Sequence, residues 1–262
     1  MADGVTLRDS IESVEQNSSA LRALRNAYSR MQDLTDNRGW TYWAGIHGYP
    51  QYLCWHHGRV GMSDQLPYDL FLPWHRAFLL YFEHTMRDQD PDARLPWWDW
   101  TSQSAHEIGI PRSYSVREVG GEENPLASGP MLAIGRSPAR NTRRAPDSPR
   151  NLPTSGDVEG LMDLGNFVDF TGQVQDVHDS VHGWVGGDMG VVATSAFDPI
   201  FWSHHCMIDR IWYLWQLRNG TNNIPADYLD KALAPFALTV RDVLDINRLG
   251  YEYAQSSVSV DA

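Results

Sequence analysis

The sequence has 262 residues, 42% of them hydrophobic and 11 of them tryptophan, so it is long enough to bury a large aromatic core. Its formal net charge of −12 argues against a nucleic-acid partner or an anionic membrane partner, and we expect neither. No apolar run is long enough to cross a membrane, no secretory signal is visible, and two cysteines are too few for a disulfide framework. A cytoplasmic location is the default expectation.

Three helices are predicted in the first ninety residues. Residues 6–35 place apolar side chains at helical spacing, which predicts one long helix. Residues 40–47 predict a short helix that ends before a glycine, which puts His47 at a helix C-terminus. A further helix is predicted to begin in the stretch Phe71-Leu-Pro-Trp-His75.

The middle of the chain changes character. Residues 95–100 are aromatic and are predicted to form a short buried segment. Residues 101–160 contain many prolines and glycines, which predicts a long irregular excursion, either a lid or a partly disordered loop. Histidines lie on both sides of it, so we predict one domain over residues 1–262. A short strand is predicted at residues 236–243, within a mixed tail.

Four histidines lie between residues 174 and 215. His178 and His182 are four residues apart, so on a helix both imidazoles leave one face and could bind one metal ion. Asp198 and Pro199 predict the start of the next helix, as cap and first residue. That helix would present an inward stripe of Phe201, His205, Ile208, Trp212 and Trp215.

The histidines fall into two sets of three. One set is His47, one of His56 and His57, and His75; the other is His178, His182 and His205. Imidazole suits copper, zinc and iron, so a pair of copper ions, two zinc ions or a di-iron site all remain open. Histidines at this spacing also occur as ordinary core or surface residues.

Four motifs resemble the central domain of the tyrosinase and catechol oxidase family, whose members are type-3 binuclear copper proteins. They are Phe71-Leu-Pro-Trp-His75-Arg, Leu95-Pro-Trp-Trp-Asp-Trp100, His178-x-x-x-His182-x-Trp-Val-Gly-Gly and Asp198-Pro-Ile-Phe-Trp-x-His-His205-x-x-Ile-Asp209-Arg-Ile-Trp. The resemblance covers about residues 20–253. It implies a mainly α fold, an antiparallel four-helix bundle that holds two copper ions, with long irregular loops.

The resemblance also implies the ligands. The first copper would take His47, His56 and His75, and the second His178, His182 and His205, with His204 beside the ligand set. Cys54 resembles the cysteine of a Cys-x-His motif that joins the ligand histidine by a thioether. The spacing from His56 to His75 is longer than in most members, so His57 is the alternative ligand.

The implied reaction is the oxidation of o-diphenols to o-quinones by O2, through a peroxide that bridges the two copper ions. Asp179 stands where many members carry asparagine, and could accept a proton from a phenol or attract a basic amine. Gln175 replaces the family's water-holding glutamate. Because glutamine is no base, weak hydroxylation of monophenols is expected.

Other positions shape the expected pocket. Val192 takes the place of the family's gate residue and predicts an open entrance for bulky phenols, Phe201 would pack beneath the site, and Gly183 follows the ligand His182. Asp99 and Asp209 are expected either to orient ligands or to form salt bridges. The Tyr251-x-Tyr253 motif resembles the one that closes the family's core domain, so no C-terminal shielding domain is expected.

The prediction is therefore a single-domain dicopper o-diphenol oxidase whose partners are O2 and a phenolic small molecule. A copper-delivery partner is not visible in the sequence. The alternatives are a tyrosinase that hydroxylates monophenols, an o-aminophenol oxidase, and, in a different functional class, a haemocyanin-like O2 carrier.

Overall fold

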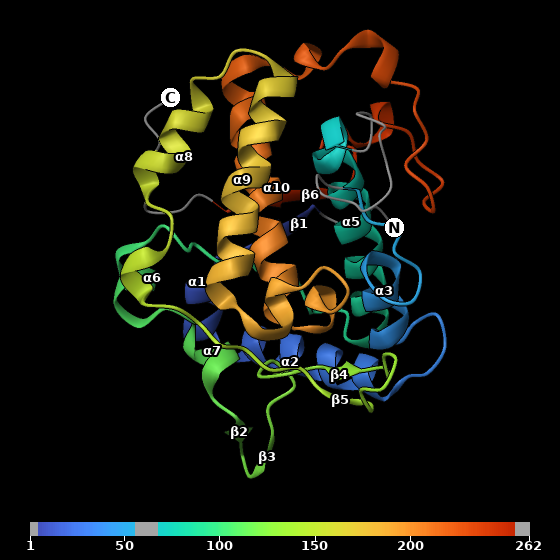
Figure 1. The fold of residues 1–262 in the computed structure, drawn as a ribbon, viewed down its shortest axis with the longest axis vertical. Coiled ribbons are helices and arrows are strands. Elements are labelled where there is room, and N and C mark those ends of the chain that lie inside the picture. Colours follow the sequence, from blue (N-terminus) through green and yellow to red (C-terminus); the bar gives the residue numbers. More distant parts are fainter. Residues whose placement is uncertain (1–4, 56–67, 255–262) are drawn as a thin grey trace.

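The computed structural model describes residues 5–55 and 68–254, and it is mainly helical (Figure 1). Four helices carry the described histidines of the two sets: α3 (Trp40–His47), α5 (Phe71–Gln89), α9 (Phe167–Val185) and α10 (Ile200–Asn219). The other α-helices are α1 (Ile11–Gln16), α2 (Ser18–Asp33), α6 (Gln103–Ile108), α7 (Arg112–Ser115) and α8 (Ser155–Met162). The predicted mainly α fold is confirmed.

The strands and 3-10 helices are short. The strands are β1 (Thr6–Arg8), β2 (Glu118–Val119), β3 (Glu122–Glu123), β4 (Pro130–Met131), β5 (Arg140–Asn141) and β6 (Tyr251–Tyr253). The 3-10 helices are η1 (Pro149–Asn151), η2 (Gly187–Gly190), η3 (Ser195–Phe197), η4 (Thr221–Asn223), η5 (Ala226–Tyr228) and η6 (Arg241–Val243). No described helix combines the length and the apolarity that a membrane span needs.

Helices α9 and α10 run antiparallel (Figure 1). Phe170, near the start of α9, stacks on Trp215, near the end of α10, with 4.6 Å between the ring centroids. At the opposite ends, the His182 ring lies 5.5 Å from the His205 ring. The antiparallel arrangement thus brings the histidines of α9 next to those of α10.

Helix α5 packs against α10 in the same antiparallel sense. The Phe82 ring stacks on the Trp202 ring with 3.4 Å between centroids, while Arg76 pairs with Asp209 further along α10. Helix α10 is buried on every side over most of its length, not only along the predicted stripe. The predicted start of α10 is one residue too early, because Pro199 is the N-cap residue and Ile200 is the first helical residue. The Asp198 carboxylate lies just before the helix and accepts from the Ile200 N–H at 3.1 Å.

The prediction of one helix over residues 6–35 is wrong. Residues Thr6–Arg8 are extended as β1, and α1 ends before Asn17. The Asn17 side chain accepts from two backbone N–H groups at the start of α2, so it begins a new helix rather than continuing the old one. Asparagine favours this capping role over a place inside a helix.

Strands β1 and β6 pair in parallel and bring the two ends of the described chain together. The Arg8 guanidinium donates to Glu83 of α5 at 2.7 Å and lies 3.7 Å from the centre of the Tyr251 ring. Both tyrosine hydroxyls of β6 donate to the Asp209 carboxylate of α10, at 2.7 and 2.6 Å. We call the buried group the closing network: Arg8, Arg76, Glu83, Asp209, Tyr251 and Tyr253.

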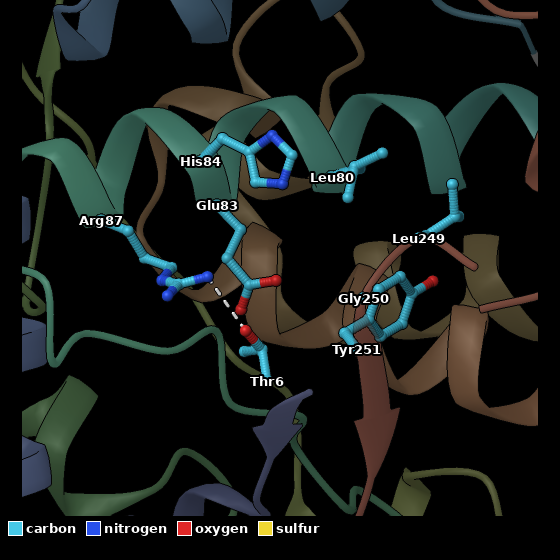
Figure 2. A pocket seen from close by; sticks show the side chains of 8 residues that line it. All are labelled: Thr6, Leu80, Glu83, His84, Arg87, Leu249, Gly250 and Tyr251. Atoms are coloured by element: carbon cyan, nitrogen blue, oxygen red, sulfur yellow. Dashed lines mark hydrogen bonds between the residues drawn. The ribbon is translucent and has the colours of Figure 1, made fainter. Parts of the chain in front are cut away.

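A pocket of about 160 Å³ lies beside the closing network, between α5 and the β1–β6 pair (Figure 2). Arg87 crosses it and donates to the Thr6 hydroxyl at 3.0 Å. The histidine in its wall is His84, whose pKa is lowered by burial. No described histidine of the two predicted sets lines this pocket, so it is separate from the part of the candidate site that the structure describes.

The excursion over residues 101–160 is not an unstructured loop. It contains the helices α6 and α7, the 3-10 helix η1, the first part of α8, the hairpins β2–β3 and β4–β5, and side chains such as Tyr114 that are fully buried in the core. Arg144, just beyond the second hairpin, pairs with Asp198 at 2.5 Å, and Arg140 pairs with Asp188 at 2.7 Å. These ion pairs fix the excursion to the segment that leads into α10.

The predicted strand over residues 236–243 is also wrong. Phe236 packs its ring on Tyr81 of α5, 5.3 Å between centroids, and the chain then turns because the Asp242 carboxylate accepts from the Thr239 N–H. The 3-10 helix η6 follows, and only an isolated bridge joins Ala232 to Thr239. The turn formed by Asp242 prevents a continuous extended run.

Glu12 in the first turn of α1 should make stability depend on pH. Burial, opposed in part by hydrogen bonds and assisted by Asp99, raises its pKa from 4.5 to about 7. The folded protein therefore retains a proton that the unfolded chain releases, so stability falls as pH rises from 4.5 to about 7. Between these pH values, the free energy of unfolding should fall by about 2 kcal/mol less in Glu12→Gln than in the unsubstituted protein, a figure that allows for the partial exposure of Glu12. Urea unfolding at pH 5 and pH 8 measures it.

The control for Glu12→Gln is Glu159→Gln, which removes an exposed carboxylate of α8 and changes the net charge equally. A pH difference that is the same in Glu12→Gln and in the unsubstituted protein would contradict the assignment to Glu12.

Candidate metal centre

The second predicted histidine set converges in the structure. His178 and His182 come from one face of α9, and His205 comes from α10. The Nε2 atom of His205 lies 3.2 Å from that of His178 and 3.3 Å from that of His182. Two nitrogens that bind one metal at about 2.0 Å and a tetrahedral angle are about 3.3 Å apart. The spacing therefore fits three ligands of a single metal ion.

Hydrogen bonds select the tautomer of the two α9 histidines. The Nδ1 atom of His178 lies 2.8 Å from the Asp179 carboxylate, and that of His182 lies 2.7 Å from the Met189 carbonyl oxygen. Both oxygens are acceptors, so each Nδ1 carries the proton and each Nε2 keeps its lone pair for a metal. The sequence could not predict the role of the Met189 carbonyl, because every residue type supplies the same backbone oxygen.

The first predicted set is described in part. His47, the last residue of α3, and His75 of α5 are both buried, and their ligand atoms lie within 4.8 Å of each other and of His205. The Nδ1 atom of His75 donates to the Phe71 carbonyl at 2.9 Å, which leaves Nε2 for a metal. His56 and His57 lie outside the described residues, as does the predicted thioether. Cys54 itself is buried in the core.

Phenylalanine rings fill the space around the imidazoles. The Phe201 ring centroid lies 4.0 Å from that of His205 and 4.8 Å from that of His47, so this side chain packs against both sets. Phe71 does the same from the other side, 4.4 Å from His75 and 4.9 Å from His178. Phe71 precedes His75 by one helical turn of α5, and this spacing is the signal in the sequence for its contact with the histidine.

His204 lies closer to the centre than expected. It is fully buried, its ring stacks 5.1 Å from that of His178, and its ligand atom lies within 4.8 Å of those of His178, His182 and His205. Among the described residues, neither of its ring nitrogens has a hydrogen-bond partner. Burial, followed by the neighbouring imidazoles, lowers the pKa of both His204 and His205 well below the ordinary value. These imidazoles are therefore neutral and able to bind a metal.

The predicted aspartates differ in their surroundings. Asp209 belongs to the closing network, where burial alone would raise its pKa but Arg76 and Arg8 lower it below the ordinary value. Of the two roles expected for Asp209, the structure therefore shows the salt bridge. Asp99 accepts from the Thr101 hydroxyl at 2.6 Å within a turn. Asp179, which is predicted to accept a phenol proton or attract an amine, contacts the Nδ1 atom of His178 at 2.8 Å.

The remaining predicted residues lie around the cluster. Gln175, one helical turn before His178, is fully buried and donates to the Tyr68 carbonyl at 2.9 Å. Val192 is 43% exposed in the segment between η2 and η3, and Gly183 has open space around its α-carbon. Gln175 is therefore held by a main-chain carbonyl inside the protein, whereas Val192 reaches solvent.

Comparison with known proteins agrees with this centre. The family model described as the common central domain of tyrosinase matches residues 37–218. A tyrosinase from Streptomyces lincolnensis is 31% identical over 211 residues, which cover 71% of this chain and 73% of that protein. A hemocyanin from Enteroctopus dofleini, A-type units Ode to Odg, is 28% identical over 293 residues, 94% of this chain but 22% of that protein.

Solved structures share the fold. Tyrosinase from Burkholderia thailandensis at high pH superposes with a TM-score of 0.81 at 21% identity, covering 97% of this chain and 75% of that one. A functional unit of octopus hemocyanin superposes with a TM-score of 0.76 at 24% identity, covering 95% and 68%. The family match, together with the converging histidines, shows that this chain belongs to the tyrosinase family and contains its type-3 copper domain.

Proposed function

We propose that this protein binds two copper ions and uses O2 to oxidise o-diphenols to o-quinones. The observation that carries the proposal is the convergence of six histidines from four helices, with donor atoms in two groups that share His205. This donor set is all imidazole, which suits copper. In the balanced reaction, two catechols and one O2 give two o-quinones and two waters.

Copper at these nitrogens would supply the binding of O2 and the acceptance of electrons from the catechol. The residues of the chain hold the imidazoles. Asp179 keeps the proton of His178 on Nδ1, and the low pKa of His205 keeps this imidazole neutral. Phe201 and Phe71 exclude water from the sides of the cluster. The exposed Val192 leaves an approach for a phenolic ring.

A tyrosinase that also hydroxylates monophenols is the alternative within the same family, and this reaction requires a base near the substrate. Gln175 is not a base, and its amide already donates to the Tyr68 carbonyl. Asp179 has a half-exposed carboxylate, so it is the candidate acceptor of a phenol proton, and the same group could suit an o-aminophenol. We propose diphenol oxidation as the main activity, with monophenol hydroxylation weaker.

A reversible O2 carrier is the candidate from another functional class, favoured by the similarity to hemocyanins. A carrier must keep phenols away from its copper ions. The 43% exposure of Val192, close to the segment that holds His182, favours an oxidase instead.

The test is oxygen uptake by copper-loaded protein with catechol and with phenol, measured side by side. Fast uptake with catechol and slow uptake with phenol is the expected result. Equal uptake with both would establish a tyrosinase. No uptake with either, in protein shown to hold two copper ions and to bind O2 reversibly, would establish a carrier and overturn the proposal.

A further inference from the structure

The pocket of about 160 Å³ beside the closing network is built from both ends of the described chain. Its walls come from α5, from β1 and from the segment 249–251, which leads into β6 (Figure 2). A molecule bound in this pocket would therefore contact the helix and both strands of the β1–β6 pair at once.

One wall of the pocket carries a cation that has no counter-ion in the described chain, Arg87. Among residues 5–55 and 68–254, its guanidinium makes one hydrogen bond, from Nη1 to the Thr6 hydroxyl at 3.0 Å, and no ion pair. A guanidinium has five N–H donors, so most of those of Arg87 lack an acceptor, including the buried Nε. By contrast, the neighbouring Arg8 and Arg76 both pair with carboxylates. Arg87 can therefore accept a further partner.

Glu83 lies in the same wall but does not neutralise Arg87. Its Oε2 atom accepts from Nε and Nη2 of Arg8, at 3.0 and 2.7 Å, and its Oε1 atom accepts from the Leu95 N–H at 2.8 Å. The closing network holds two arginines and two acidic residues, so its formal charge is zero. Arg87 thus leaves one net positive charge at the pocket, and this charge favours an anionic ligand.

The remaining wall favours a ligand with a short apolar part. Leu80 is buried, Leu249 is half-buried, and the Tyr251 ring lies beside them with its hydroxyl already bonded to Asp209 at 2.7 Å. The pocket is similar in size to an engineered cavity of about 150 Å³ that accommodates benzene, so it has room for about six non-hydrogen atoms. His84 adds no charge at pH 7.5, because burial lowers its pKa below 6.5.

We propose that this pocket binds a short aliphatic carboxylate, whose oxygens accept from Arg87 and whose alkyl chain packs on Leu80 and Leu249. Such a ligand would link α5 to both strands of the β1–β6 pair and would stabilise their pairing. The binding requires neither copper nor the oxidase function. Phosphate offers similar oxygens without an alkyl chain and would bind more weakly.

Calorimetry on the copper-loaded protein at pH 7.5 tests this proposal with butyrate, phosphate and propylammonium. Butyrate should bind with a Kd of about 0.1–1 mM, and phosphate about three- to tenfold more weakly, because it lacks the alkyl contacts. Propylammonium, which has the same propyl group and the opposite charge, should not bind. Equal binding of butyrate and propylammonium, or no binding of butyrate, would overturn the proposal.

Two variants assign the binding to this pocket. Arg87→Gln removes the charge and should weaken butyrate binding by about tenfold or more. Leu249→Glu retains Arg87 but adds a carboxylate to the wall, and it should weaken binding at least as much. The matched control is Arg38→Gln, which removes an exposed arginine paired with Asp36 at 2.6 Å and should change nothing. Unchanged butyrate binding in both pocket variants would place the ligand elsewhere, including at copper, and would overturn the proposal.

Thermal unfolding tests whether the ligand stabilises the fold. Butyrate at ten times its Kd should raise the melting temperature by about 3–6 °C, and sodium chloride at the same ionic strength should raise it less. The rise caused by butyrate should disappear in Arg87→Gln and in Leu249→Glu. A rise of the same size in both variants would be a general solvent effect and would contradict stabilisation through the pocket.

Discussion

His205→Ala should reduce the copper content from two ions per chain to one or fewer and lower catechol oxidation by more than about 100-fold. His205 provides an Nε2 atom within 3.3 Å of those of His178 and His182, and its ring also stacks on that of His75. No other residue occupies this central place among the described parts of the chain. Metal analysis after dialysis, followed by oxygen uptake, measures both effects.

His204→Ala is the comparison that tests the ligand assignment. His204 is as buried as His205 and borders the same histidines, so its loss should disturb packing while leaving most of the copper bound. His106→Ala is the control for the loss of an imidazole outside the cluster, because His106 is hydrogen-bonded to the Pro153 carbonyl. If His204→Ala loses more copper than His205→Ala, the assignment of His205 as ligand is wrong.

Asp209→Asn is expected to lower the free energy of unfolding by about 3–5 kcal/mol, because it leaves two buried guanidinium groups without their shared counter-ion. Arg76 lies 2.5 Å from one carboxylate oxygen, and Arg8 lies 3.4 Å from the other. Because the folded pKa of Asp209 is lowered, its contribution should also be lost as pH falls below the ordinary aspartate range. Urea unfolding of the copper-free protein at pH 7 and at about pH 3 measures both.

The control for Asp209→Asn is Asp245→Asn, which removes an exposed partner of Arg248 and should cost less than about 0.5 kcal/mol. Tyr253→Phe removes one hydroxyl donor from the same network and should cost about 1 kcal/mol. An Asp209→Asn protein as stable as the Asp245→Asn protein would show that the closing network does not stabilise the fold.

Local patterns predicted the helices that carry the site, because their signals lie within a few residues. Glycines bound α3 on both sides, and Asp198 and Pro199 mark the start of α10. The strands β1 and β6 were not predicted. Arg8 and Tyr253 are 245 residues apart, and neither segment alone indicates which strand it pairs with. The sequence pattern also predicted too little burial for α10. A stripe of apolar residues indicates one buried face, whereas α10 is buried on every side over most of its length.

The sequence predicted the part of the candidate site that depends on side-chain type. The spacing of His178 and His182 alone implied a shared face, and motif resemblance selected the histidines that the structure brings together. The backbone oxygens of Phe71 and Met189, which set the tautomers, could not be inferred from residue type. The approach of His204 to the cluster follows from the rotation of α10 against α9, which is a tertiary property.

The pairing of β1 with β6 has a consequence for biosynthesis. At about 5–20 residues per second, roughly 12–50 s separate the synthesis of Arg8 from that of Tyr253. Asp209 is made 44 residues before Tyr253, so for the last part of that interval, about 2–9 s, it lacks its tyrosine donors and α10 awaits its final packing. The closing network is therefore the last part of the described fold that can form, once residue 253 has been synthesised.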